Sequence, residues 1–209
     1  MKIFTYLCPN PKCGLRTPAL ESDAFNGRCP RCLEIMQIVD EREPAIAPPN
    51  SPVHGTELVV LVDNVRSAFN VGAILRTSEC FGVKRLILCG ITPGTDNTAV
   101  LKASVGAEAW LSIENQPNLL NVCKQLELEG FTIWALELGK TAQPVNTLIQ
   151  RPAKLALVIG NERCGVDQQV LNKCAKIVYI PMLGNKNSLN VEVSFGVALG
   201  FITLLPAEN

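Results

Sequence analysis

The clearest pattern along the chain begins near residue 57, where short apolar runs alternate with longer segments of helical periodicity. The run LVVLV at Leu58–Val62 has no polar position, as is typical of a parallel strand covered on both faces. Six runs are predicted as strands: Leu58–Val62, Arg85–Cys89, Ala109–Ile113, Thr132–Leu136, Leu155–Ile159 and Ile177–Pro181.

Between these runs, apolar residues recur at the spacing of one helix face. Gly130 closes one such segment, in a position typical of a helix C-terminus. The predicted helices run from Asn70 or Val71 to Phe81, and over Thr98–Val105, Pro117–Gly130, Asp167–Lys173 and Val191–Leu205. Alternating strands and helices predict an α/β fold with a parallel sheet.

The first fifty or so residues do not share this alternation. The segment from Asp40 to Val53 has four prolines and little apolar pattern, which indicates an extended, semi-rigid linker. We therefore predict a small module at residues 1–40, a proline-rich linker at residues 41–55 and an α/β domain at residues 56–209. His54, the only histidine, is expected in a loop without a catalytic role.

Two pairs of cysteines stand in the predicted N-terminal module, in C-P-N-P-K-C and C-P-R-C. Pairs of thiolates on two short turns can converge on one metal ion, as in structural zinc sites. The predicted ligands are Cys8, Cys13, Cys29 and Cys32. Zinc is the expected ion and the module resembles a zinc ribbon or a rubredoxin-like knuckle, but four thiolates also accept iron. Two reduced pairs without a metal would leave so short a segment with little to hold it folded.

The composition limits the classes of function that the chain can have. The 209 residues include 19 basic and 19 acidic side chains, so either a surface that binds a polyanion is a local patch or the affinity for the polyanion is modest. No apolar run reaches the roughly 18 residues of a membrane span, and the N-terminus lacks the pattern of a signal peptide. We expect a soluble, cytoplasmic protein that binds no membrane. The other five cysteines are expected to be ordinary buried residues.

Three polar stretches follow predicted strands or open predicted helices. They read DNVRSAFNVGAILRT at residues 63–77, LVIGNERCGV at residues 157–166 and YIPMLGNKNSLNVEVSF at residues 179–195. In the third stretch, Ser188 and Asn190 stand where the last helix is predicted to begin. Their side-chain oxygens suit a helix N-terminus, which taken alone is a structural explanation.

Together, the three stretches resemble the motifs of the SpoU-type (TrmH-like) RNA ribose 2′-O-methyltransferases of the SPOUT superfamily. The matches are N-x-G-x-x-x-R at Asn70, Gly72 and Arg76, G-N-E-x-x-G at Gly160, Asn161, Glu162 and Gly165, and I-P-M with S-L-N-V at Ile180–Met182 and Ser188–Val191. The resemblance covers Leu58 to the C-terminus. It implies a SPOUT-type parallel sheet with a C-terminal deep trefoil knot, a feature that periodicity alone does not show.

The resemblance also implies S-adenosylmethionine as cofactor and a role for each matching residue. The implied catalytic residues are Arg76, Asn70, Glu162, Ser188 and Asn190. The implied cofactor-binding residues are Gly160, Ile180, Met182, Ser188 and Leu189. We assign Arg76 to hold the phosphate beside the reacting hydroxyl, because a guanidinium with a pKa above about 12 is a poor base. The structural alternative is a surface arginine paired with Glu79 or Glu162.

The predicted function is methylation of the ribose 2′-hydroxyl of a structured RNA, either tRNA or rRNA. The resemblance implies a homodimer, for which Val193, Val197, Phe201 and Leu204 offer an apolar stripe on the last helix. The alternatives are a non-catalytic RNA-binding protein on the same fold and a rubredoxin-like iron protein. The sequence departs from the family at Ser67–Phe69, where Asp-Pro is common, and this makes the RNA substrate harder to predict.

Overall fold

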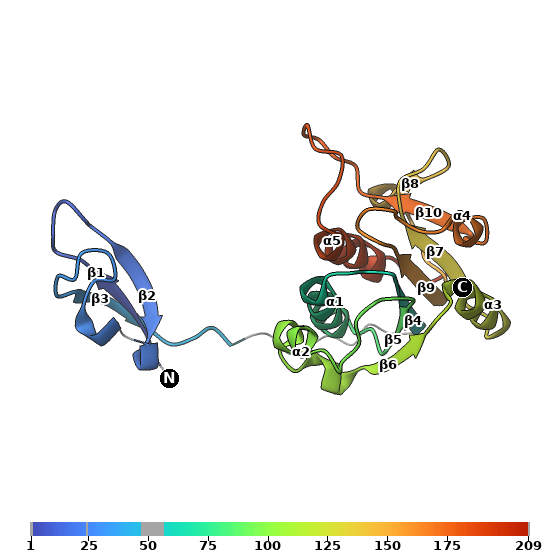
Figure 1. Ribbon diagram of the computed structural model, residues 1–209. Helices are drawn as coiled ribbons and strands as arrows, with labels where there is room; N and C mark the ends of the chain where they lie inside the picture. Colours follow the sequence, from blue (N-terminus) through green and yellow to red (C-terminus); the bar gives the residue numbers. More distant parts are fainter. Residues whose placement is uncertain (1, 24, 47–56, 209) are drawn as a thin grey trace. The chain divides into compact units, whose positions relative to one another are not determined.

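The structure is a computed structural model that describes residues 2–23, 25–46 and 57–208 of the chain (Figure 1). The chain divides into two compact units, Met1–Ser51 and Pro52–Asn209. His54 and most of the predicted linker lie outside the described residues.

The N-terminal unit contains a three-stranded antiparallel sheet in the order β2-β1-β3. Its strands are β1 (Ile3–Leu7), β2 (Arg16–Leu20) and β3 (Gln37–Arg42). Strand β3 pairs with β1 as far as Arg42, so the sheet continues into the segment that the prolines had marked as linker. The buried residues are only Tyr6, Cys8, Cys29 and Met36 among those described, and so small a core needs a further source of stability.

The C-terminal unit contains a seven-stranded sheet in the order β6-β5-β4-β9-β7-β10-β8, in which every pair is parallel. The strands are β4 (Glu57–Asp63), β5 (Arg85–Cys89), β6 (Ser112–Gln116), β7 (Thr132–Leu136), β8 (Gln143–Pro144), β9 (Lys154–Ile159) and β10 (Lys176–Tyr179). The α/β fold with a parallel sheet is confirmed. Strand order is not sequence order, since β9 pairs with both β4 and β7.

Helices cover both faces of this sheet (Figure 1). They are α1 (Ala68–Cys80), α2 (Thr98–Ser104), α3 (Leu119–Leu128), α4 (Gln168–Leu171) and α5 (Val191–Leu204), with the 3₁₀ turns η3 (Ala107–Trp110) and η4 (Val145–Thr147). One core joins α1, α2 and α5 to the alternate strand residues Val60 and Val62. The other joins α3 and α4 to Val59 and Leu61. Burial on both faces explains why these strands have no alternating pattern.

The strand predicted at Ala109–Ile113 is wrong. Ala107–Trp110 form η3, and the strand β6 begins only at Ser112. β6 reads SIENQ and lies at an edge of the sheet, where polar side chains can face solvent. A search for apolar runs therefore selects the apolar residues before this strand in place of the strand itself.

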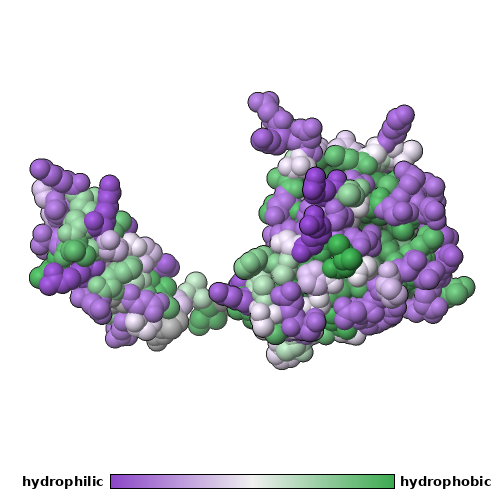
Figure 2. All heavy atoms as spheres, viewed as in Figure 1, coloured by the Kyte–Doolittle hydropathy of each residue, from purple (hydrophilic) through white to green (hydrophobic). Residues whose placement is uncertain are grey.

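The other predicted elements begin and end close to their predicted bounds, and β5 and β7 match them. Among the described residues, no helix combines the length and apolar character that crossing a membrane requires. The face of the C-terminal unit seen in Figure 2 mixes hydrophilic and hydrophobic residues.

Candidate functional site

A pocket of about 260 Å³ lies where the carboxyl ends of β7, β9 and β10 meet the N-terminus of α5. This is the edge at which open parallel sheets usually bind ligands. The predicted cofactor-binding residues Gly160, Ile180, Met182, Ser188 and Leu189 all line it, as do the predicted catalytic residues Glu162, Ser188 and Asn190. The second and third sequence motifs thus meet at one cavity.

Hydrogen bonds at the rim of this pocket join all three motifs. The side-chain amide of Asn70, on α1, donates to Glu162 Oε1 over 3.0 Å. The amide of Asn190 in turn donates to Asn70 Oδ1 over 3.1 Å. Three polar side chains that are far apart in the sequence therefore form a single network.

Glu162 is the centre of that network. Its carboxylate also accepts from the backbone N–H groups of Arg66 and Ser67, at 3.1 and 3.2 Å. Burial opposes the ionisation of Glu162, but the backbone N–H groups of Glu162 and Arg66 and the Asn70 amide outweigh it and lower its pKa below the ordinary value. The carboxylate is therefore ionised at neutral pH and holds the start of α1 against the loop after β9.

Asn190 has two roles in the structure. Its side-chain oxygen accepts from the backbone N–H of Glu192 over 2.8 Å, which makes it the N-cap of α5. Its amide nitrogen meanwhile donates to Asn70. The structural and the functional explanation of this residue are thus compatible, because its two polar atoms serve different partners.

The loop at residues 160–165 folds back on itself. Asn161 Oδ1 accepts from the backbone N–H groups of Arg163 and Cys164, and its amide donates to the Asn64 carbonyl. A Cβ at Gly160 would stand 2.5 Å from the backbone carbon of Gly165. The lack of a side chain at Gly160 is therefore required by the packing of this loop.

Arg76 lies on the exposed side of α1 and does not line the pocket. Within the described part of the chain its guanidinium has no hydrogen bond or ion pair, so the structural alternative, a pairing with Glu79 or Glu162, is absent there. Glu162 instead accepts from the side-chain amide of Asn70.

Two pocket residues, Glu137 and Tyr179, carry no motif signal. The Glu137 carboxylate accepts from the backbone N–H groups of Leu138 and Val166, at 2.8 and 3.1 Å. Glu137 directly follows the predicted strand Thr132–Leu136, which was the one signal in the sequence that could have marked it, whereas Tyr179 lies inside the predicted strand Ile177–Pro181.

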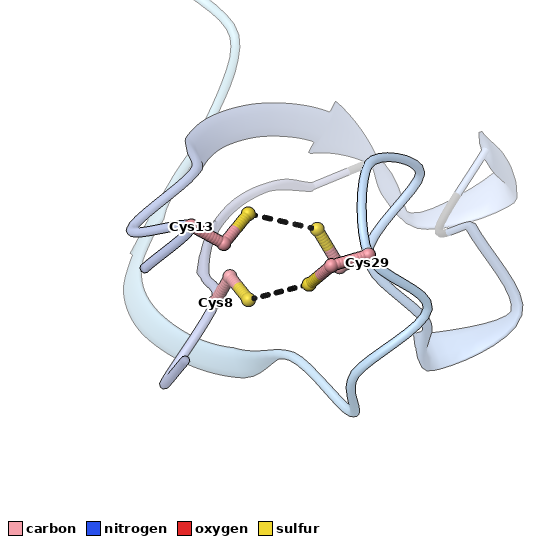
Figure 3. Close-up of side chains that lie close together, drawn as sticks. Cys8, Cys13 and Cys29 are labelled. Atoms are coloured by element: carbon pink, nitrogen blue, oxygen red, sulfur yellow. Dashed lines mark hydrogen bonds between the residues drawn. The ribbon is translucent and has the colours of Figure 1, made fainter. Parts of the chain in front are cut away.

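The four N-terminal cysteines converge on one point, and three of them, Cys8, Cys13 and Cys29, are labelled in Figure 3. Their sulfur atoms all lie within 4.8 Å of one another, with 3.4 Å between Cys8 and Cys32 and 3.7 Å between Cys13 and Cys29. A tetrahedral ion with metal–sulfur bonds of about 2.3 Å needs sulfurs about 3.8 Å apart. The donor set therefore fits a four-thiolate metal site.

The local backbone conformation brings the four cysteines of this cluster together. Gly14 and Leu33, each one residue after a cysteine, adopt positive φ angles of 56° and 64°, which turn the chain back toward the cluster. Burial raises the pKa of the Cys29 thiol, but the backbone N–H groups of Arg31 and Cys32 outweigh it and lower that pKa to about 7. The turn at Cys29 therefore favours the thiolate, which is the form that binds metal, whereas burial raises the pKa of the Cys8 thiol to about 12.

Comparison with known proteins identifies the class to which this fold and pocket belong. Residues 57–200 match the SpoU rRNA Methylase family, so the chain belongs to that family.

An uncharacterized tRNA/rRNA methyltransferase of Archaeoglobus fulgidus is 36% identical over 146 residues, which are 69% of this chain and 63% of that protein. One of Borreliella burgdorferi is 32% identical over 141 residues, 68% of this chain and 61% of that protein. The chain thus spans less than two thirds of the length of these relatives.

Solved structures share the fold. The A. aeolicus TrmH/SpoU tRNA modifying enzyme is 29% identical with a TM-score of 0.64, over 72% of this chain and 77% of that chain. AviRb, a SpoU methyltransferase from Streptomyces viridochromogenes solved in complex with AdoMet, is 23% identical with a TM-score of 0.65, over 83% of this chain and 69% of that chain.

Proposed function

We propose that this chain is an S-adenosylmethionine-dependent methyltransferase that acts on the ribose 2′-hydroxyl of a structured RNA, either tRNA or rRNA. The observation that carries the proposal is the network of Asn70, Glu162 and Asn190 at the rim of the pocket. Family membership and the AdoMet complex of a protein with the same fold support it. The knotted path and the cytoplasmic location expected from the sequence stay predictions.

The residues of the pocket fit the proposed cofactor. Ile180, Met182 and Leu189 supply apolar surface for a flat base, while Ser188 and the neighbouring backbone supply polar contacts. A sulfonium cofactor supplies an activated methyl group, so the protein has to bind it, orient the ribose and exclude water.

Each network residue then has a defined task. Glu162 fixes the amide of Asn70, which with the Asn190 amide forms a rigid polar rim for the ribose. Arg76 has no partner among the described residues, so its guanidinium is free to hold an RNA phosphate in a bidentate contact. In this mechanism Arg76 acts by positioning and charge, and the proton of the hydroxyl leaves to another base or to water.

Mapping of 2′-O-methyl groups tests the proposal directly. Total RNA from cells with and without this chain is compared, and purified protein is then given labelled S-adenosylmethionine and the unmodified RNA. We expect one ribose site or a few to lose the methyl group without the protein and to regain it in vitro. A chain that binds RNA but transfers no label would favour the non-catalytic alternative.

For the N-terminal unit we propose one structural zinc ion held by Cys8, Cys13, Cys29 and Cys32. The sulfur–sulfur distances and the small core support it. We expect elemental analysis to find one zinc per chain, and Cys29→Ser to lose it, whereas Cys80→Ser, an exposed cysteine outside the cluster, keeps it.

Removal of the zinc with a chelator should unfold the N-terminal sheet, because metal-binding energy is folding energy in such small units. The C-terminal unit should stay folded, since its two cores are independent of the cluster. Purified protein without metal and with four freely titratable thiols would contradict the zinc proposal. Visible absorption would identify thiolate-bound iron instead.

A further inference from the structure

The charges in the candidate cofactor pocket all have one sign. Of the residues that line it, Glu137 and Glu162 are charged, and both are acidic. Arg163 and Lys186 are close in sequence to lining residues, but their side chains are exposed and do not line the cavity. A negative pocket with apolar walls favours a cation over a neutral ligand of the same shape.

Glu162 is engaged by the network at the rim, so Glu137 is the carboxylate that remains for the ligand. Glu137 is fixed by the two backbone N–H groups of Leu138 and Val166. Each of its oxygens accepts one of these bonds, which leaves further acceptor capacity on both.

The neighbouring loop is shaped around this carboxylate. A Cβ at Gly165 would stand 2.3 Å from Glu137 Oε2, and Gly165 also has a φ of 69°. Gly165 is thus required both by its backbone conformation and by the carboxylate beside it. The loop therefore holds a negative charge at a fixed place beside the pocket.

We propose that Glu137 is a specificity-determining residue that favours the sulfonium form of the cofactor over its demethylated product. This inference rests on the proposed function. S-Adenosylmethionine carries one positive charge more than S-adenosylhomocysteine, and the two are otherwise alike in their amino-acid, ribose and adenine groups. The carboxylate of Glu137 stabilises the charged substrate and gives no such gain to the neutral product, which assists product release.

Calorimetric binding of both ligands to the full chain tests the proposal. We expect Glu137→Gln to lower the ratio of S-adenosylmethionine affinity to S-adenosylhomocysteine affinity by about threefold to tenfold. Glu137→Asp keeps the charge, so it should keep the ratio even if both affinities fall. Glu57→Gln removes a carboxylate at the opposite end of the strands and should leave the ratio unchanged.

A purely structural role for Glu137 would weaken both ligands equally, so an unchanged ratio in Glu137→Gln would overturn the inference. A wild-type chain that binds neither ligand would overturn the proposed function itself. If Glu137→Gln unfolds the loop, the salt dependence of ligand binding to the wild-type chain still tests the inference. Added salt should then weaken the binding of S-adenosylmethionine more steeply than the binding of S-adenosylhomocysteine, and an equal salt dependence of the two affinities would refute the charge effect.

Discussion

At the scale of single residues, the polar groups of the site form a series of hydrogen bonds in which each residue fixes the next. Glu162 accepts from two backbone N–H groups and from Asn70, and Asn70 accepts from Asn190. Arg76 stands outside this chain of contacts. Side chains that are already fixed by hydrogen bonds are suited to orienting a ribose. A cationic side chain without a protein partner is suited to binding a negatively charged group of the substrate.

We therefore predict that Arg76→Ala lowers methyl transfer by about a hundredfold or more, the size expected for loss of one essential charge contact. Arg76→Lys should restore little of it, because a point charge cannot form a bidentate contact. Transfer of labelled methyl groups to the cognate RNA measures the effect, and calorimetric binding of the cofactor should be unchanged. Lys124→Ala, an exposed cation on α3, is the control. Near-normal turnover of Arg76→Ala would show that the family's mechanism does not apply to this chain.

At the scale of elements, Gly72 shows how a residue in a functional motif can serve packing. It lies in α1, where a Cβ would stand 2.4 Å from the Val100 carbonyl and 2.5 Å from the Ala103 Cβ, both on α2. A backbone carbonyl cannot move aside as a flexible side chain can. Gly72 therefore permits the close approach of α1 and α2.

Gly72→Ala should lower the free energy of unfolding by about 1–3 kcal/mol through overpacking, despite the better helix propensity of alanine. Denaturant unfolding measures this change. Gly196→Ala is the matched control on α5, since its Cβ would meet only Thr77 Cγ2 at an ordinary 3.5 Å. Equal stability of Gly72→Ala and wild type would mean that the two helices can separate at little cost.

The sequence predicts the elements that have a strong pattern and misses those that depend on tertiary position. α1, β5 and β7 are found because apolar residues repeat at the correct spacing or run without interruption. β6 is missed because an edge strand tolerates polar residues, and β8 is too short to leave a pattern. Glu137 was not predicted as a pocket residue, since a glutamate after a strand has no distinctive chemistry until the loop at residues 160–165 is folded against it.

At the scale of the whole molecule, α5 has apolar residues on two sides. Phe195, Ala198, Leu199 and Ile202 are buried in the core of the unit. The stripe predicted as an interface remains exposed in the single chain, with 46% exposure at Phe201 and 86% at Leu204. The stripe therefore does not simply cover the sheet.

We propose that this stripe forms the homodimer interface implied by the family resemblance. Sedimentation should show a dimer at micromolar concentration, and Phe201→Asp should give a folded monomer because it would bury a charge in the interface. Leu128→Asp, an exposed leucine on α3, should remain dimeric. A wild-type monomer, or equal dissociation of both variants, would contradict the proposal.

The strand order has a consequence for how the protein is made on the ribosome. The interior strand β4 pairs with β9, so one side of β4, residues 57–62, cannot be paired until residues 154–159 have been synthesised. During synthesis the apolar residues of β4 have only β5 as a strand partner while much of the chain is still to be translated. Pairings between distant segments form slowly and leave apolar surface exposed to other molecules in the meantime. The nascent chain is therefore most vulnerable to aggregation and most dependent on chaperones in the interval between the emergence of β4 and that of β9.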